Sequence, residues 1–256
     1  MRFLFLILTL MVTSSYSWIA VAGNGGRVYE IRHGDRWYDI SPSAYIRYVS
    51  YKPDGKLLAL PSGGEYLYIR DPNDVFWQRV TGPGYGKDTW FKDMCAQGNH
   101  IYVLDKNCNV LKLLENSWIE VVNIPFAKAI AGAQSDYWKL FIVCYDLKVY
   151  GIYQDGGQEQ LASLPSGQGW DITYDPSENE LMAANGDDVF CYDFHDDYWY
   201  AGDNWKSMDI DNSPEGAVFV KSAVNIYKCS SLSCTANCRK INNYMDYYVT
   251  DIAISY

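Results

Sequence analysis

Short stretches of alternating apolar and polar residues, separated by turn-forming clusters, run along most of this chain. Alternation with a period of two predicts β-strands with one buried face. Residues 18–21, 27–31 and 36–40 are such stretches, and the glycine- and asparagine-rich residues 23–26 between the first two predict a hairpin turn. Long amphipathic helix patterns are missing, so the sequence predicts an all-β protein.

One position of this pattern recurs about every 40 residues. A fixed period of this size is typical of repeat architectures in which each copy is one supersecondary unit. Four short strands per copy predict the blade of a β-propeller. A large aromatic at the same place in successive blades is expected to fill the space between neighbouring sheets. The recurring position holds Trp37, Trp77, Trp118, Leu161, Trp199 and Cys238.

A second recurring position marks the strand that opens each copy, at residues 47–49, 92–94, 128–130, 170–172, 206–208 and 250–252. The last of these lies at the C-terminus, whereas residue 18 begins a copy that lacks its opening strand. We therefore expect the two ends to complete one blade, which would remove exposed sheet edges. The predicted fold is all-β: a six-bladed β-propeller with four-stranded blades, closed by the N- and C-terminal strands in one blade.

The first 17 residues have the features of a secretory signal peptide. A basic start at Met1-Arg2 precedes an apolar run at residues 3–12, and small residues precede a cleavage site after Ser17. This run is too short to span a membrane. We therefore expect a secreted, extracellular protein in which residues 18–256 form a single β-propeller domain of six repeats of about 40 residues.

The chain is acidic, with a formal net charge of −10 at pH 7 that becomes more negative when Arg2 leaves with the signal peptide. An acidic surface repels phosphate backbones, so nucleic acid is not expected as a partner. Insertion into a membrane is not expected either. No pattern indicates an oligomeric state.

Seven cysteines are present, three of them crowded into the last repeat. In a secreted chain some should pair, and an odd count leaves at least one without a partner in the same chain. Cys229 and Cys238 are the first disulfide candidates because they fall on neighbouring predicted strands, and Cys234 is a rival partner. A zinc site is the other interpretation of this crowding, although no paired C-x-x-C motif occurs.

The opening strands and the strands that follow them resemble the repeat of the tectonin and fish-egg-lectin group of secreted propeller proteins. The matching segments are residues 92–94 (Lys-Asp-Met), 128–132 (Lys-Ala-Ile-Ala-Gly), 206–208 (Lys-Ser-Met) and 18–29. The resemblance covers essentially the whole chain after the signal peptide, with degenerate copies. It implies sugar binding without catalysis, with glycans on microbial or host cell surfaces as partners and a role in innate immunity.

The start of the opening strands is the candidate carbohydrate-binding site. Aromatic faces there can stack on a pyranose while neighbouring charged groups orient its hydroxyls. The alternative is that these aromatics pack between blades and the charges are solvated. The candidate residues are Tyr45, Arg47, Trp90, Lys92, Asp93, Phe126, Lys128, Trp170, Asp171, Tyr248 and Asp251.

Asp93, Asp171 and Asp251 fall in alternate blades, near the predicted central channel. Three carboxylates around a pore could hold Ca²⁺, or they could accept hydrogen bonds from backbone N–H groups or water. Apart from this calcium alternative, no cofactor is expected.

The sequence contains no catalytic signature such as H-E-x-x-H or G-x-S-x-G, so we expect no enzyme. The predicted function is a lectin that binds multivalently through several weak blade-edge sites. The first alternative is a secreted propeller scaffold that binds proteins and has no sugar site. A calcium-dependent hydrolase built on the channel aspartates is a further alternative.

Overall fold

A computed structural model describes the protein over residues 18–23, 25–32, 36–61, 66–81, 90–115, 117–133, 135–175, 179–186, 188–201, 209–213, 216–221, 225–229, 238–241 and 249–254. The side chains of residues 81, 209, 212–213, 216–221, 229, 238 and 250 lie outside this description. The predicted signal peptide, residues 1–17, and the candidate site residue Tyr248 also lie outside it.

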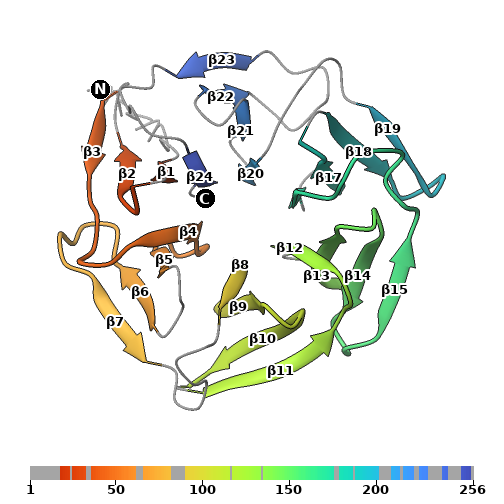
Figure 1. Cartoon of the computed structure of the whole chain (residues 1–256), viewed down its shortest axis with the longest axis horizontal. Coiled ribbons are helices and arrows are strands. Elements are labelled where there is room, and N and C mark those ends of the chain that lie inside the picture. The colour runs from red at the N-terminus through yellow and green to blue at the C-terminus, as the bar shows by residue number, and fades with distance from the viewer. Residues whose placement is uncertain are drawn as a thin grey trace, which may run out of the picture.

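Antiparallel four-stranded sheets surround a central channel (Figure 1). The innermost strand of each sheet is the one that opens its repeat, and in blade A this is the C-terminal strand. Blade A consists of β24 (Val249–Ile254), β1 (Ile19–Gly23), β2 (Val28–Ile31) and β3 (Trp37–Asp39). Blade B consists of β4 (Ile46–Tyr51), β5 (Leu57–Pro61), β6 (Tyr66–Arg70) and β7 (Gln78–Thr81). Blade C consists of β8 (Phe91–Gln97), β9 (His100–Asp105), β10 (Asn109–Leu114) and β11 (Ser117–Asn123).

The second half of the chain repeats this order. Blade D consists of β12 (Ala127–Gly132), β13 (Trp138–Cys144), β14 (Val149–Tyr153) and β15 (Gln158–Leu161). Blade E consists of β16 (Asp171–Asp175), β17 (Glu180–Ala184), β18 (Val189–Asp193) and β19 (Tyr198–Ala201). A further sheet consists of β20 (Asp209–Ser213), β21 (Gly216–Lys221), β22 (Asn225–Cys229) and β23 (Cys238–Ile241).

The prediction of six equivalent blades is corrected by the structure. Five blades, A to E, are described through both their backbones and their packed cores. The sheet of β20 to β23 is a paired four-stranded backbone, but most of its side chains lie outside the description. The described part of its inner strand is Asp209–Ser213, and the predicted opening residues 206–208 lie outside the described residues. This repeat has Cys238 where most others have tryptophan, so its sequence is a poor guide to its register.

The chain ends meet in blade A, where β1 pairs with β24 on one side and with β2 on the other. Ile19 is opposite Ile254, and Val21 is opposite Ile252. All five residues of β1 are buried, which follows from a strand that is covered on both faces and both edges. The terminal strands therefore stabilise the ring through non-local pairing, and no free edge remains on β1.

The recurring tryptophan position packs between blades, as predicted. Trp199 and Leu161 are buried, and Trp77 packs against the core between blades A and B. The Trp77 indole N–H donates to the Ile40 carbonyl oxygen at 2.5 Å, and the Trp199 indole N–H donates to the Ala162 carbonyl oxygen at 2.6 Å. Both bonds reach the end of the outer strand of the preceding blade, so these indoles tie neighbouring blades together and are not free platforms for sugar.

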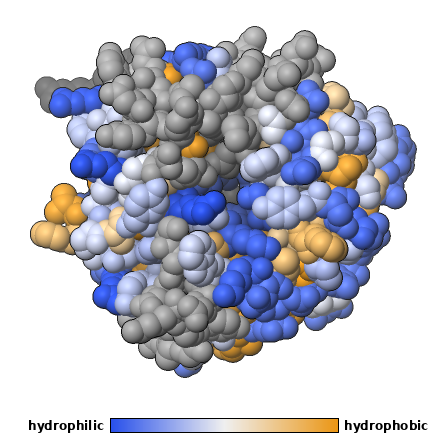
Figure 2. Space-filling model, viewed as in Figure 1, coloured by the Kyte–Doolittle hydropathy of each residue, from blue (hydrophilic) through white to orange (hydrophobic). Residues whose placement is uncertain are grey.

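The face seen in Figure 1 is mostly hydrophilic where it is not drawn in grey, with apolar side chains in scattered spots (Figure 2). Over the described residues, no helix is long and apolar enough to span a membrane. The architecture therefore concentrates its apolar surface between the sheets and leaves polar loops outside.

Candidate ligand-binding site

Three successive inner strands, β4, β8 and β12, begin with a β-bulge. In β8, for example, Phe91 is opposite Asp105 and Asp93 is opposite Leu104, so Lys92 has no partner residue in the ladder. A bulge re-aims the extra side chain out of the regular alternation. The extra residues of the three bulges are Arg47, Lys92 and Lys128.

An exposed aromatic precedes each bulge by two residues. Tyr45, Trp90 and Phe126 are 52%, 54% and 61% exposed, while the residue between each aromatic and its cation is buried. An even number of strands per blade restores the chain direction, so these strand starts lie at one end of the ring. We call Tyr45, Arg47, Trp90, Lys92, Phe126 and Lys128 the bulge rim.

The lysines of the bulge rim reach across to the next blade. The Lys92 Nζ donates to the Ala127 carbonyl oxygen at 3.1 Å and lies 3.1 Å from the Cys108 Sγ. The Lys128 Nζ lies 5.5 Å from the ring centroid of Trp170 and 5.9 Å from that of Tyr145. Both distances are in the range of cation–π attraction. The junction between blades D and E therefore combines a cation with several partly exposed aromatic faces.

Tyr145 belongs to this junction but was missed by sequence reasoning. It lies in the turn between β13 and β14, and its N–H donates to the Phe126 carbonyl oxygen at 3.0 Å. It is 42% exposed, and Trp170 is 36% exposed. The signal that could have found it is its position directly after a buried strand that ends beside the start of β12.

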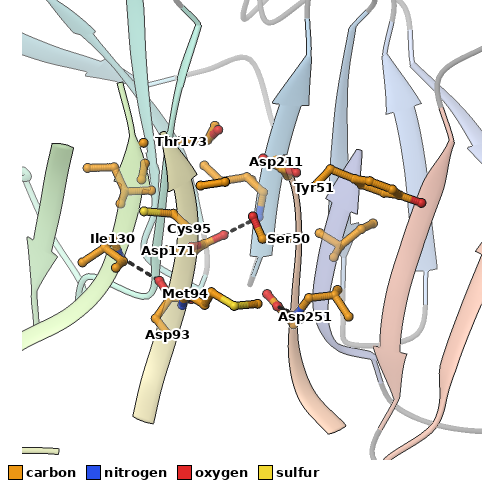
Figure 3. A pocket seen from close by; sticks show the side chains of 17 residues that line it. Ser50, Tyr51, Asp93, Met94, Cys95, Ile130, Asp171, Thr173, Asp211 and Asp251 are labelled. Carbon is orange, nitrogen blue, oxygen red and sulfur yellow. Dashed lines mark hydrogen bonds between the residues drawn. The ribbon is translucent and has the colours of Figure 1, made fainter. Parts of the chain in front are cut away.

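The predicted channel aspartates line a small cavity of about 50 Å³ at the centre of the ring (Figure 3). Each accepts a hydrogen bond from the backbone of the next inner strand. Asp93 accepts from Ile130 N at 2.7 Å, Asp171 from Ile210 N at 2.7 Å, and Asp251 from Val49 N at 2.5 Å. These hydrogen bonds join each of these inner strands to the next one around the channel.

A fourth aspartate, Asp211, makes the same contact with Ile254 N at 2.8 Å. It was not among the predicted channel aspartates, because the opening strand of its repeat was predicted at residues 206–208, which lie outside the described residues. The channel aspartates therefore bond to backbone N–H groups, which is one of the two roles proposed for them. No group of three or more His, Cys, Asp or Glu side chains that could hold a metal ion occurs among the described residues.

Burial and the nearby Asp171 carboxylate raise the pKa of Asp93 to about 8, although its bonds from Ile130 N and Met94 N and the Lys128 ammonium oppose this rise. Because the folded-state pKa lies above the unfolded value, the folded protein keeps a proton that the unfolded chain releases. The contribution of Asp93 to the free energy of unfolding should therefore fall as pH rises from about 4 to about 8 and then level off. We expect Asp93→Asn to flatten this decline.

The measurement is the free energy of unfolding by denaturant at several pH values for both proteins. The histidines are common to both, so the difference isolates Asp93. Asp54→Asn, at an exposed turn, is the control and should keep the wild-type profile. Parallel profiles for wild type and Asp93→Asn would contradict the expectation.

Among the cysteines whose side chains the structure describes, three are free and one is paired. Cys95, Cys108 and Cys144 are free thiols, and burial raises the pKa of Cys144 to about 12. Cys191, buried on β18, is disulfide-bonded, and its partner lies outside the described side chains. Cys229 and Cys238 are opposite each other in the register of β22 and β23, but their side chains lie outside the description, so that disulfide remains a prediction.

No protein-family model matches the chain, and no curated protein matches it in sequence. Solved structures do match it in fold. A chain from the crystal structure of a nidogen/laminin complex matches with a TM-score of 0.77 at 9% identity, covering 94% of this chain and 99% of that one.

Two structures of virginiamycin B lyase from Staphylococcus aureus also match, each at 12% identity. A catalytically inactive H270A form with quinupristin has a TM-score of 0.64 and covers 92% of this chain and 83% of that one. The selenomethionine-substituted form has a TM-score of 0.60 and covers 87% and 79%. At such low identity the likeness concerns the fold alone. The protein is therefore a β-propeller, and its resemblance to the tectonin group remains a prediction.

Proposed function

We propose that this protein is a secreted β-propeller lectin that binds cell-surface glycans through the bulge rim. The observation that carries the proposal is the repetition of one arrangement in blades B, C and D: an exposed aromatic, a buried residue and a bulged cation. An aromatic face can cover the C–H side of a pyranose, and a nearby cation can donate to its oxygens.

The arrangement favours several shallow sites over one deep pocket. The aromatics stand at the starts of separate inner strands, so each would contact its own sugar unit. Weak sites on one rigid body gain avidity when a surface presents many copies of the same glycan. The predicted signal peptide would deliver the protein to such surfaces, and recognition without catalysis fits the absence of a catalytic motif in the sequence.

A second candidate function is a protein-binding scaffold. Val75 and Phe76, in the connection from β6 to β7, are 78% and 77% exposed. Strand direction alternates within a blade, so this connection lies at the opposite end of the ring from the bulge rim. Exposed adjacent apolar residues favour contact with another protein. The neighbour in the nidogen/laminin complex shows a propeller crystallised with a protein partner.

A glycan-array screen of the chain from Trp18 tests the lectin proposal, with Trp90→Ala and Phe76→Ala as matched variants. We expect glycan-specific binding that falls by up to about 10-fold in Trp90→Ala, because aromatic stacking contributes about 0.5–1.5 kcal/mol. Phe76→Ala should bind as the wild type does, because it removes an exposed aromatic that lies outside the bulge rim.

Thermal unfolding must first show that both variants are folded. Absence of binding to any glycan by folded wild-type protein would overturn the lectin proposal and leave the scaffold. Equal losses in Trp90→Ala and Phe76→Ala would mean that the rim is not the site.

A further inference from the structure

Lys128 occupies an unusual place in an acidic protein. Its ammonium lies between the rings of Trp170 and Tyr145, and Phe126 stands two residues before it. We call Phe126, Lys128, Tyr145 and Trp170 the D–E notch. Among the described residues no carboxylate lies within ion-pair distance of Lys128. Each oxygen of the nearby Asp93 already accepts a backbone N–H.

The backbone adopts uncommon conformations to build this notch. Phe126 has a φ of 65°, in the left-handed region that residues other than glycine rarely adopt. Gly186 has a φ of 89°, and a Cβ there would lie 2.8 Å from the Trp170 indole nitrogen. Strain of this kind persists where the surrounding structure imposes it and is concentrated at functional sites. Two residues with positive φ, Phe126 and Gly186, therefore lie beside the exposed aromatic side chains of the D–E notch.

The chemistry of the notch selects a ligand class. Partly exposed aromatic faces suit the C–H face of a pyranose ring, and the ammonium without a carboxylate partner suits an anion next to that ring. Asp146, which follows Tyr145 in the turn between β13 and β14, is paired with Lys148 at 2.9 Å. A neutral sugar would use the aromatic faces and leave the positive charge uncompensated.

We propose that the D–E notch is the primary subsite of the rim and that it binds a pyranose carrying a carboxylate, such as a hexuronate. The inference rests on the proposed glycan binding and adds its ligand class. Phe126 and Trp170 contact the sugar ring, Tyr145 borders it, and Lys128 pairs with the carboxylate. Lys92 is occupied by Ala127 O and Cys108 Sγ in the preceding junction, which makes that junction a poorer anion site.

The test compares one hexuronate-containing oligosaccharide with the same oligosaccharide after reduction of its carboxylates to neutral alcohols, by calorimetric titration. We expect the acidic form to bind about 10-fold or more tightly, the range of a hydrogen bond between charged groups. Lys128→Met should abolish this preference, so that the variant binds the acidic and the reduced forms with equal affinity. Lys128→Arg should retain the preference, whereas Lys112→Met, at a lysine of β10, should bind as the wild type does.

The outcomes separate this inference from the proposed function. Equal binding of the acidic and reduced forms by the wild type would overturn the carboxylate assignment while glycan binding stands. A sulfated glycan without carboxylates could instead bind as tightly as the hexuronate and lose that binding in Lys128→Met. That result would replace the carboxylate assignment with a general anion site. No binding of either form by folded protein would overturn both proposals. Thermal unfolding of each variant shows whether a loss of affinity reflects a loss of structure.

Discussion

Replacing Arg70 with methionine is expected to lower the free energy of unfolding by about 3–5 kcal/mol, because it leaves the buried Glu30 carboxylate without its main partner. Arg70 and Glu30 are almost completely buried, and their closest N–O distance is 2.5 Å. Tyr51 donates to the same Glu30 oxygen at 2.7 Å, and Arg32 pairs with the other at 2.5 Å. The pair joins β2 of blade A to β6 of blade B, so its loss should loosen the ring.

The measurement is denaturant unfolding monitored by fluorescence, and the same loss should lower the melting temperature by roughly 6–20 °C in a domain of this size. Arg27→Met is the matched control, since Arg27 pairs with Asp39 at 2.5 Å but both side chains are substantially exposed. Exposed pairs contribute about 0–1 kcal/mol. The double variant Glu30→Gln/Arg70→Met should recover part of the loss. A single Arg70→Met change no larger than the control would refute this account.

Gly132→Ala is the second substitution with a large expected effect. Gly132 ends β12, where a Cβ would lie 2.1 Å from the Ala96 carbonyl oxygen and 2.9 Å from its carbonyl carbon. Those atoms belong to the backbone of β8 and cannot rotate away as a side chain can. Blades C and D would have to separate, so we expect a loss of about 3 kcal/mol, at the upper end of the usual cost of overpacking.

Gly157→Ala provides the control for this substitution. A Cβ at Gly157 would meet only side-chain atoms of Asp155 and Tyr153, at 3.2 Å, and Gly157 is exposed. Its effect should stay within about 1 kcal/mol, partly because alanine reduces the entropy of the unfolded chain. The measurement is the free energy of unfolding of both variants in denaturant. Equal values would show that β8 and β12 can move apart without loss of stability.

Much of the architecture could be predicted because the pattern that encodes it is local. Period-two alternation and turn clusters predicted the strands, and the recurring position led to the blades and to the packing role of Trp77 and Trp199. The count of six equivalent blades failed in the repeat that contains Cys238, where the periodic signal is weakest. The described opening strand there is Asp209–Ser213, and Asp211 on it accepts a hydrogen bond from Ile254 N at the channel.

The candidate site was predicted as a list of residues, not as an arrangement. Tyr45, Trp90 and Phe126 are exposed as the lectin hypothesis requires, whereas Asp93 and Asp251 are engaged with the backbone of the next blade. Neither the bulges nor the approach of Tyr145 to Lys128 could be inferred, because both depend on which residues face each other across strands.

The sequence by itself determined the class of fold, the position of five blade-opening strands and the pairing of the two chain ends, because hydrophobic periodicity and the order of repeats can be seen in the sequence alone. Only the tertiary structure decided the register between strands and the contacts between blades. The bulge in β12 takes Lys128 out of the strand pairing, and its ammonium lies near Trp170. The alternation of residues along one strand does not predict such a bulge.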